Sequence, residues 1–557
     1  MKTLLRLYLF SCVLAFLFPL TSRAGSATWA TNPSSSDWNT ATNWTPQTVP
    51  NSETDVATFG TSTVTNLSIT DASVSLDSAI FNSGAPPYTL TIQIYNLFFY
   101  GAGIVNNSGS VQSIVAPDTD ENAVALFFYN SSTAGNMITV STIGGAIEFF
   151  DASSANTATL NLTTGSLQAQ LDFWDSSTAA NATINASNDA TINFFNSASG
   201  GNSTLNLTSA AFAIFDGSNK AEHMNGNCAG GQGEYSSQID FQGSSDAGDG
   251  TFTAVGGSTS GEIGGFILLD SIATADKATF IINGGMGAGL SGTELFFMDS
   301  ATAANANITA NGGVDGSQGG AIVFAKKSKG GKASIMLNGN AVLDITRHRN
   351  PGVTIGSLAG AGSVLLAANT LTIGSNNQST TFSGVIEGTG GLTKSGTGTL
   401  VLDGINTYTG TTTVNGGILG GGGLIAGTLT VAANATIAPA AGTATSVTLK
   451  IKKGVTFQAS SSYNCLLSGK GRKVKSDQIA AKGVTIGSGA QFILTDQITG
   501  KLPSGTSFTV ISNTANTPIS GTFANLADGA IVTAGNTKLQ ASYEGGDGND
   551  LTLTVVQ

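Results

Sequence analysis

The chain has 557 residues, of which 73 are glycine and only 10% are charged, and its formal net charge is −12. Abundant Gly, Ser, Thr and Asn are poor helix formers, so the composition excludes a mainly helical protein. The 40% share of hydrophobic residues provides enough apolar surface to exclude general disorder. An acidic chain offers phosphates no broad basic surface, so we expect no nucleic acid partner.

The N-terminal segment has the pattern of a secretory signal peptide. Lys2 and Arg6 accompany an apolar run from Leu7 to Leu20, and small residues follow before Gly25. The apolar run is shorter than the roughly 20 residues that a membrane-spanning helix needs. The sequence therefore predicts a signal peptide over 1–24 and no transmembrane helix in the mature chain. It also predicts export to the extracellular space, the cell surface or the periplasm.

A similar sequence motif recurs along the first half of the chain, as in FWDSSTAANATINA, Phe173–Ala186, and FMDSATAANANITA, Phe297–Ala310. In each copy a polar residue follows two positions after an apolar one, and successive copies are about 20 to 29 residues apart, the range typical of stacked coils. This alignment gives the turn residues Asn130, Asp151, Asp175, Asn196, Asp216, Gly243, Asp270, Asp299 and Lys326. The position two before the turn is most often Phe: Phe128, Phe149, Phe173, Phe194, Phe241, Phe297 and Phe324.

Each copy predicts a strand, a small polar turn and a second strand. Nine positions after the turn residue comes a further apolar residue, namely Leu160, Ile184, Leu205, Phe252, Ile308 or Ile335. Apolar residues alternate with Thr, Asn or Ser in both strands, so one face points inward and the other to water. One unit cannot bury its apolar face alone, whereas parallel stacking of coils would. The fold class predicted is therefore all-β, an elongated β-solenoid.

One segment departs from the repeat and holds candidate metal ligands. Ser218–Ser237 is longer than its neighbours and should bulge from the rod; it contains His223 and Cys228, too few ligands to predict a metal site. Cys228 and Cys465 are far apart in sequence, so we expect two free thiols. No metal ligand or cofactor is predicted.

Basic residues gather in Ala325–Lys332 and in Asp344–Asn350. Both segments are expected to be solvated turns, and together they form the best local candidate for an anion-binding site. The segment Gly545–Leu553 approaches a calcium-binding nonapeptide, but it occurs once, so calcium is not expected.

From about Thr354 the period changes. The segment TFSGVIEGTGGLTKSGTGTLVLDGINTYTGTTTVNGGIL, Thr381–Leu419, closely resembles the autotransporter-associated β-strand repeat of secreted bacterial passenger regions. The resemblance implies a right-handed parallel β-helix and a role in export or passenger folding. It rests on glycines such as Gly390 and Gly410 and on Lys394, Asn406 and Tyr408.

Both ends extend this resemblance. Ala27–Gly60 looks like the opening of related proteins, whose first coils and cap would use Trp38, Asn43, Trp44, Pro50, Asp55 and Phe59. The residues up to Gln557 look like closing passenger coils, so a C-terminal translocator barrel is expected to be lacking. The domains predicted are a degenerate β-helix with its cap over 25–353 and a passenger-like β-helix over 354–557, with the repeat at about 381–419.

The function predicted is a secreted or cell-surface structural or adhesive module without catalysis, whose partners are extracellular polysaccharide or cell-surface components. The alternative is a polysaccharide-active lyase or hydrolase, because β-helices also carry enzymes with paired carboxylates. The sequence shows no adjacent Asp pair and no protease motif. Asp175, Asp270 and Asp299 share a turn column in which other coils carry Asn, Gly or Lys, so they are interpreted as turn residues. No catalytic residue is therefore predicted.

Overall fold

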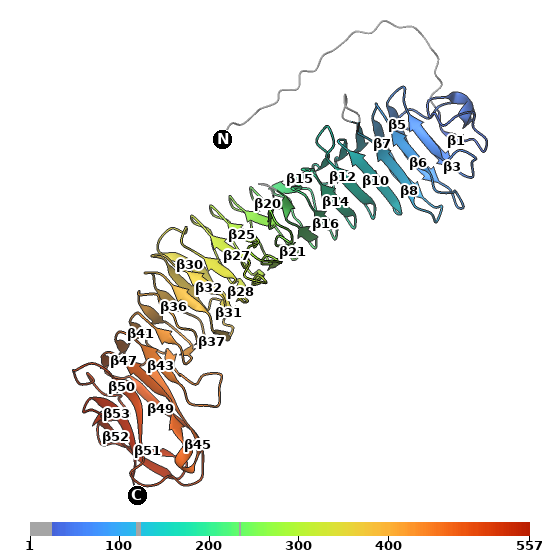
Figure 1. Cartoon of the computed structure of the whole chain (residues 1–557). Coiled ribbons are helices and arrows are strands. Elements are labelled where there is room, and N and C mark those ends of the chain that lie inside the picture. Colours follow the sequence, from blue (N-terminus) through green and yellow to red (C-terminus); the bar gives the residue numbers. More distant parts are fainter. Residues whose placement is uncertain (1–24, 119–123, 233–235, 557) are drawn as a thin grey trace.

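The structure is a computed structural model that describes residues 25–118, 124–232 and 236–556. It is nearly all β, and its strands stack in parallel into a curved rod, with β1 at one tip and the C-terminal strands at the other (Figure 1). Within the described residues the two helices are short 3₁₀ turns, η1 (Ala41–Asn43) and η2 (Gly471–Lys473). The predicted parallel β-solenoid is confirmed, whereas its right-handed coiling stays a prediction.

Two long sheets form the rod. Sheet 1 has 17 strands: β1 (Ala27–Trp29), β2 (Trp44–Thr45), β3 (Val56–Phe59), β5 (Val74–Phe81), β7 (Leu97–Asn106), β9 (Ala125–Phe128), β11 (Ala146–Phe149), β13 (Gln170–Phe173), β15 (Thr191–Asn196), β17 (Phe212–Gly217), β20 (Gln238–Phe241), β23 (Phe266–Leu269), β25 (Glu294–Phe297), β27 (Ala321–Phe324), β29 (Val342–Asp344), β32 (Ser363–Leu365) and β35 (Val385–Glu387).

Sheet 2 lies on the other side of the core: β4 (Asn66–Ile69), β6 (Thr89–Ile92), β8 (Gln112–Ala116), β10 (Ile138–Ile143), β12 (Thr159–Thr163), β14 (Thr183–Ser187), β16 (Thr204–Leu207), β18 (Asn225–Cys228), β21 (Thr251–Ala254), β24 (Thr279–Ile282), β26 (Asn307–Ala310), β28 (Ser334–Leu337), β31 (Ser357–Gly360), β34 (Thr380–Phe382), β37 (Thr399–Leu402), β39 (Ile418–Gly420), β42 (Thr436–Ile437), β45 (Ser462–Lys470), β46 (Lys475–Ser476) and β49 (Gln491–Thr499).

Two smaller sheets complete the C-terminal part. Sheet 3 holds β30 (Gly352–Ile355), β33 (Thr370–Ile373), β36 (Leu392–Lys394), β38 (Thr412–Val414), β41 (Leu429–Val431), β44 (Val455–Phe457) and β48 (Val484–Ile486). Sheet 4 holds β40 (Leu424–Ile425), β43 (Thr448–Ile451), β47 (Gln478–Ala481), β50 (Ser507–Asn513), β53 (Asp550–Val556), β52 (Thr537–Gly545) and β51 (Ile531–Ala534), the last four pairing antiparallel. A short pair, β19 (Gly231–Gln232) and β22 (Glu262–Ile263), stands apart.

The core is built from the inward columns that the repeat predicts. In sheet 1 the rings of Phe149, Phe173 and Phe194 stack with centroids 4.8–4.9 Å apart and nearly parallel planes. In sheet 2, Leu160, Ile184 and their counterparts form the facing column, and both columns are fully buried. Parallel in-register pairing places equivalent residues one strand spacing apart, about 4.8 Å, which is also a good distance for stacked rings. Stacking of repeated coils therefore joins the inward apolar residues of each strand into a continuous core.

Two backbone positions shape the corner between sheets 1 and 2. Both lie in the left-handed region, five residues apart, and a single bridging residue pairs with neighbouring coils between them. The first position holds Asn130, Asp151, Asp175, Asn196, Gly217, Gly243, Ser271, Asp299 and Lys326; the second holds Gly135, Asn156, Ala180, Gly201, Glu222, Gly248, Asp276, Ala304 and Gly331.

Two predicted turn residues are wrong by one position. The structure places Gly217 and Ser271, rather than Asp216 and Asp270, in the left-handed turn. Their coils point Phe215 and Leu269 inward. A slip of one residue reverses the face of every side chain in a strand, and the sequence alignment had taken the wrong face in these two coils.

The predicted bulge over Ser218–Ser237 is also wrong in its first half. Residues 218–224 form an ordinary corner, and β18 joins sheet 2 in register with β16 and β21. Gly226 takes the inward position, where a Cβ would lie 2.7 Å from the ring of Phe252. The larger aromatic of the next coil thus fills the space that the glycine leaves, and only the residues after β18 depart from the coil.

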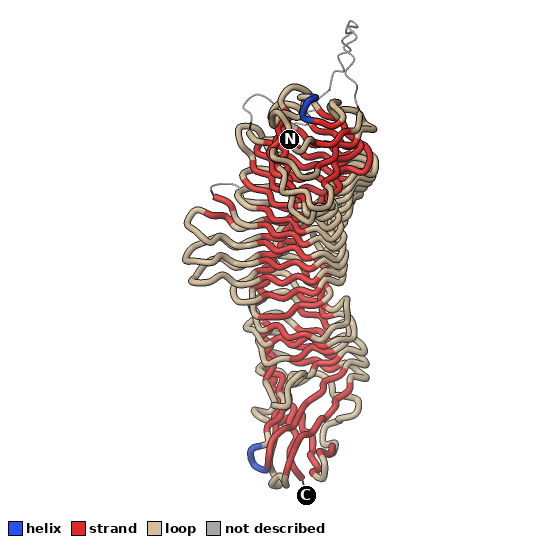
Figure 2. The backbone as a smooth tube through the Cα atoms, turned by 90° about the vertical axis from the view of Figure 1, so that its right-hand side faces the viewer, coloured by secondary structure: helices blue, strands red, loops and turns tan. Residues whose placement is uncertain are grey.

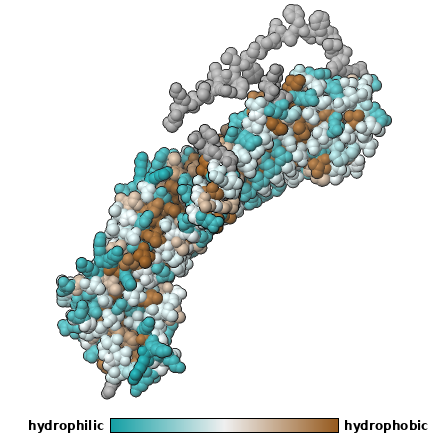
Figure 3. All heavy atoms as spheres, in the orientation of Figure 1, coloured by the Kyte–Doolittle hydropathy of each residue, from teal (hydrophilic) through white to brown (hydrophobic). Residues whose placement is uncertain are grey.

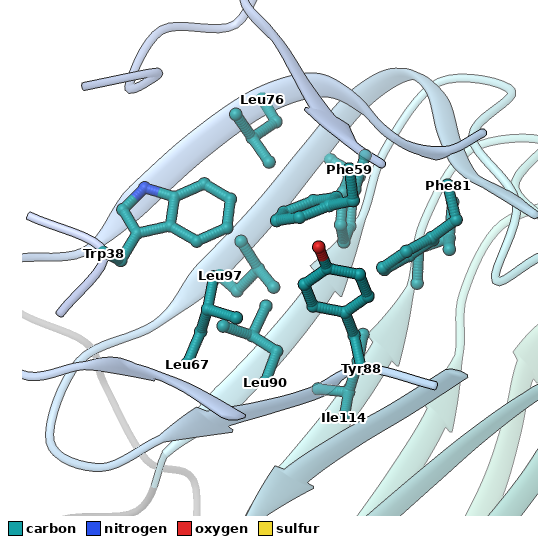
Figure 4. A pocket seen from close by; sticks show the side chains of 12 residues that line it. Trp38, Phe59, Leu67, Leu76, Phe81, Tyr88, Leu90, Leu97 and Ile114 are labelled. Carbon is teal, nitrogen blue, oxygen red and sulfur yellow. The ribbon is translucent and has the colours of Figure 1, made fainter. Parts of the chain in front are cut away.

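The N-terminal cap closes the rod with buried tryptophans. The Trp44 indole donates to the carbonyl of Trp38 (2.8 Å), and the Trp38 indole donates to that of Pro50 (3.2 Å). Buried Asn43 is satisfied by the Ser34 amide and the Asp37 carbonyl. Figure 4 shows the enclosed apolar void beneath this cap, whose volume of about 10 Å³ is no more than a water molecule needs. The void belongs to the core and is not a ligand site.

Candidate functional site: the outward face of sheet 1

From β12 to β18 the outward face of sheet 2 is polar, and its asparagines bond to one another. Asn161, Asn185, Asn206 and Asn227 occupy one register position, and each amide donates to the side-chain oxygen of the Asn in the preceding coil over 2.9–3.0 Å, from Asn185 onward. We call these four residues the Asn ladder. Its hydrogen-bonding groups are used within the ladder, which suits a solvated structural face.

The outward face of sheet 1 is aromatic instead. Seven half-buried side chains from β7 to the end of β15 form an aromatic ladder: Phe98, Tyr100, Phe127, Tyr129, Phe150, Trp174 and Phe195. Centroids lie 4.8 Å apart for Phe98 and Phe127, 4.9 Å for Tyr129 and Phe150, and 4.1 Å for Trp174 and Phe195. Since most ring faces are covered by the next ring, the ladder exposes mainly ring edges and the tyrosine hydroxyls.

Carboxylates interrupt the ladder in the row that begins with Phe98 and Phe127. Glu148 on β11 pairs in register with Asp172 on β13, which pairs with Asn193 on β15. Asp172 is only 3% exposed, and its two oxygens accept from Gln170 Nε2 (2.7 Å) and Asn193 Nδ2 (2.8 Å). Asp240, two coils beyond Asn193, accepts from Gln238 Nε2. We call Glu148, Asp172 and Asp240 the acidic row.

Burial governs the protonation of the acidic row. Desolvation and the charge of Asp172 raise the pKa of Glu148 to about 7. Desolvation also raises the pKa of Asp172 to about 6, against the opposing effect of its amide donors, and does the same for Asp240. The row therefore loses negative charge as the pH falls from neutral to mildly acidic.

Further along, the same face becomes an apolar patch. Phe296 and Val323 are buried against the half-buried side chains of Phe266, Leu268 and Met298, all of them on the outside of sheet 1 or directly after its strands. Figure 3 shows hydrophobic side chains gathered over the middle coils of the rod. The guanidinium of Arg347 lies 5.9 Å from the centre of the Phe296 ring.

Protruding loops flank this patch. Figure 2 shows them standing out from one side of the rod at mid-length. The loops over 255–265, 283–293 and 311–320 lead into β23, β25 and β27, and they bond to one another: the Met286 amide donates to Gly257 (2.9 Å) and the Val314 amide to Gly285 (3.0 Å). Met286 and Val314 expose about half of their surface. Apolar groups at loop tips beside an apolar sheet face are typical of a contact surface.

The candidate metal and thiol residues lie apart. His223 is exposed on a corner and contacts Asp249, whereas Cys228 is buried inside the rod. Burial raises the pKa of Cys228 to about 12. Cys465 is likewise buried, and both are free thiols. Within the described residues no group of three or more His, Cys, Asp or Glu is placed to hold a metal ion.

The structure also places the turn aspartates, the calcium-like segment and the two basic segments singled out in the sequence. Asp175 and Asp299 occupy corner turns, and Asp270 precedes one. Gly545–Leu553 forms the turn of the β52–β53 hairpin, where Asp550 accepts from the Asn513 amide (2.8 Å). The two basic segments, Ala325–Lys332 and Asp344–Asn350, come together on neighbouring coils and contribute to one shallow cleft.

In the C-terminal repeat, the polar motif residues are buried and form hydrogen bonds within the rod. Lys394 is buried, and its Nζ donates to the carbonyls of Ser395 (2.6 Å), Gly396 (3.1 Å) and Gly416 (3.2 Å). The Asn406 side chain accepts from the Ile386 amide (3.0 Å) and donates to Gly404 (3.2 Å). The hydroxyl of buried Tyr408 pairs with that of Thr412 (2.5 Å). These contacts close turns between coils, so these motif residues stabilise the fold.

Sequence reasoning missed the outward face of sheet 1. Glu148 and Asp172 are 24 residues apart, and only parallel pairing makes them neighbours. A signal was present, because the residue after each inward Phe is Tyr129, Phe150, Trp174 or Phe195 in four successive coils. Aromatic residues at a position expected to face water indicate a contact surface.

Comparison with known proteins supports the resemblance seen in the C-terminal half. Residues 392–419 match the family model described as Passenger-associated-transport-repeat. Over 98 residues the chain is 39% identical to the adhesin BmaC autotransporter of Brucella suis biovar 1 (strain 1330), which covers 17% of this chain and 3% of that relative. The described part of the chain contains no helix with the length and hydrophobicity needed to cross a bilayer. The chain thus contains a segment that matches a passenger-associated transport repeat within a parallel β-solenoid, and this architecture fits a passenger-type protein.

Proposed function

We propose that the protein is an exported, non-catalytic adhesive module whose contact surface is the outward face of sheet 1 between β7 and β27. The observation that carries this proposal is the contrast between the two faces of the rod. The aromatic ladder and apolar patch leave aromatic and apolar groups at the surface, whereas the Asn ladder uses its own hydrogen-bonding groups. Aromatic side chains are enriched in interfaces, and a long rod allows many weak contacts in parallel.

The partners proposed are extracellular polysaccharides or other cell-surface components. The similarity of a short segment to an autotransporter adhesin supports this class of function. Export through the predicted signal peptide at 1–24, which lies outside the described residues, would place the rod in the periplasm, at the cell surface or outside the cell. Fractionation of the producing cells, with N-terminal sequencing of the exported form, should yield a chain that begins near Gly25.

Adhesion can be tested on beads coated with the full-length mature protein. Tyr129→Ser and Trp174→Ser together should reduce retention on immobilised plant and bacterial polysaccharides and on fixed cells. A matched double variant on the other face, Asn185→Ser and Asn206→Ser, should retain binding. Equal retention by both variants, with both folded, would remove sheet 1 as the contact surface.

The acidic row favours one alternative, a polysaccharide hydrolase using Glu148 and Asp172. Neighbouring carboxylates with raised pKa values are the groups that glycoside hydrolysis needs. However, Asp172 is almost fully covered and both its oxygens accept amide hydrogen bonds, which suits a structural carboxylate better than a nucleophile. New reducing ends after incubation with the same polysaccharides, abolished by Glu148→Gln, would establish the hydrolase and refute the non-catalytic proposal.

A further inference from the structure

A shallow cleft of about 480 Å³ opens on the corner that follows β27 and β29. One rim is Lys326–Gly331, the other is His348–Thr354, and the segments are joined by backbone hydrogen bonds. The Lys326 amide donates to the carbonyl of Arg347 (3.0 Å), and the Arg349 amide donates to that of Lys326 (2.7 Å). The cleft therefore lies between two coils whose relative position is fixed.

His348 holds the two rims together. Its ring nitrogens face the carbonyl oxygens of Ser328 (2.8 Å) on one rim and Arg349 (2.7 Å) on the other. Buried Asn369 in the next coil donates to the carbonyls of Ile345 (2.8 Å) and His348 (3.0 Å). These side chains fix the backbone around the cleft and leave the lysines of the rim directed at solvent.

The cleft is strongly basic in an acidic protein. Four of the chain's 22 Lys and Arg residues line it, namely Lys326, Lys327, Lys329 and Arg349, and Lys332 and Arg347 directly adjoin the two rims in sequence. Among the residues that the structure describes, Lys326 is the member held in an ion pair, with Asp299 at 2.8 Å, and the residues lining the cleft include no Asp or Glu. Asp344 lies nearby, but its carboxylate accepts from the Thr346 amide (2.7 Å). The positive charge is thus largely uncompensated.

The turn geometry does not require these cations. Lys326 occupies the left-handed turn position with φ 55°, where the two preceding coils carry Ser271 and Asp299 and earlier coils carry Asn, Asp or Gly. Asn, Asp and Gly tolerate this conformation best, so lysine is a locally unfavourable choice. The turn conformation therefore does not dictate the exposed lysine side chain at this position.

We propose that this cleft binds a short segment of an anionic polysaccharide through its carboxylate or sulfate groups. Arg349 can engage a carboxylate or sulfate in a bidentate manner, and the lysines on the opposite rim supply point charges. Asn350 and Thr354 also line the cleft and can meet sugar hydroxyls. Its volume suits a few sugar units. This site is separate from sheet 1 and does not rest on the proposed adhesive role.

Nucleic acid fits this part of the rod less well. Phosphate-backbone binding draws on an extended basic tract. The corners of the preceding coils instead carry Asp299, Asp276 and Asp249, which would repel a long polyphosphate laid along the rod. The basic surface is confined to two coils, which favours local recognition of a short anionic oligosaccharide.

Calorimetric titration of the full mature protein can test the proposal. The probes are oligogalacturonate, a heparin oligosaccharide, neutral dextran oligosaccharide and single-stranded DNA of equal charge. We expect binding of one or both anionic glycans, weakening as salt rises, and none of dextran. Oligogalacturonate and heparin separate a carboxylate ligand from a sulfate ligand. Equal or stronger binding of DNA, or binding of none of the probes, would overturn the proposal.

Two variants locate the site. Lys326, Lys327 and Lys329 changed together to Gln should weaken glycan binding about tenfold or more, the loss expected for one charge-assisted hydrogen bond. The matched control changes Lys470, Arg472 and Lys473 to Gln at the exposed tip between β45 and β46, where the charge removed is equal. A similar loss in both triples would show diffuse charge attraction and refute the site.

The variant Lys326→Asn separates a loss of binding from a loss of folding. Asn is the residue that equivalent turns use, so this variant should be at least as stable as the wild type while binding the glycan more weakly. Unchanged affinity in Lys326→Asn and in Arg349→Gln would contradict the proposal.

Discussion

Replacing Phe173 by Ala should damage the rod strongly but only locally. The ring is fully buried and stacks on Phe149 at 4.9 Å and on Phe194 at 4.8 Å. Removing a buried Phe costs about 3–5 kcal/mol through lost burial and the cavity that remains. Each stacked contact contributes about 0.5–1.5 kcal/mol within that range. Because each coil contacts mainly its neighbours, the cost should appear in β11, β13 and β15 and fade beyond them.

Hydrogen exchange followed by mass spectrometry measures this pattern. Amides of β13 and the adjacent strands should lose protection by an amount equivalent to about 3 kcal/mol or more, while β49 keeps wild-type exchange. Trp174→Ala is the matched control. Trp174 is the next residue of the same coil, but its ring is half-buried on the outward side, so its removal should destabilise the coil less. A loss below about 1 kcal/mol at β13 would refute the inward Phe column, and equal loss of protection along the whole rod would refute locality.

Four further outcomes are expected. Ala180→Gly should stabilise the protein by about 0.5–1 kcal/mol in thermal unfolding, because Ala180 has φ 50°, whereas Ala182→Gly in the buried core should destabilise it. The folded pKa of Glu148, about 7, exceeds its unfolded value of 4.5, so stability should rise as pH falls from about 8 to about 4.5, with a smaller rise in Glu148→Gln; an unchanged pH profile in that variant would contradict the assignment. Cys228 and Cys465 should resist iodoacetamide until the protein unfolds, and reaction of either thiol in the native state would show it exposed. Small-angle scattering should give a radius of gyration above about 30 Å, against about 24 Å for a compact globule of this length.

The sequence determined the architecture because stacking depends on recurring side chains. The Phe column, the apolar column nine residues after the turn and most of the left-handed corner residues could be predicted, since each depends on alternation and turn chemistry within one coil. The cap residues Trp38, Asn43 and Trp44 could be identified as well, and the structure shows them buried together. Asp216 and Asp270 were assigned wrongly because the alternation in those coils permits two registers.

Tertiary structure alone decided which residues share a surface. Glu148 and Asp172 are more than 20 residues apart in sequence, and so are Lys326 and His348. Whether the two members of each pair become neighbours depends on the number of loop residues in each coil. Loop lengths vary from the tight turn at Gly144–Gly145 to the protruding loops beside β25, so sequence spacing does not fix which outward residues meet. Pairing of the inward columns sets the register of each strand, and the outward face follows from that register. The inner columns are therefore readable coil by coil, whereas the aromatic ladder, the acidic row and the basic cleft exist only once the coils are stacked.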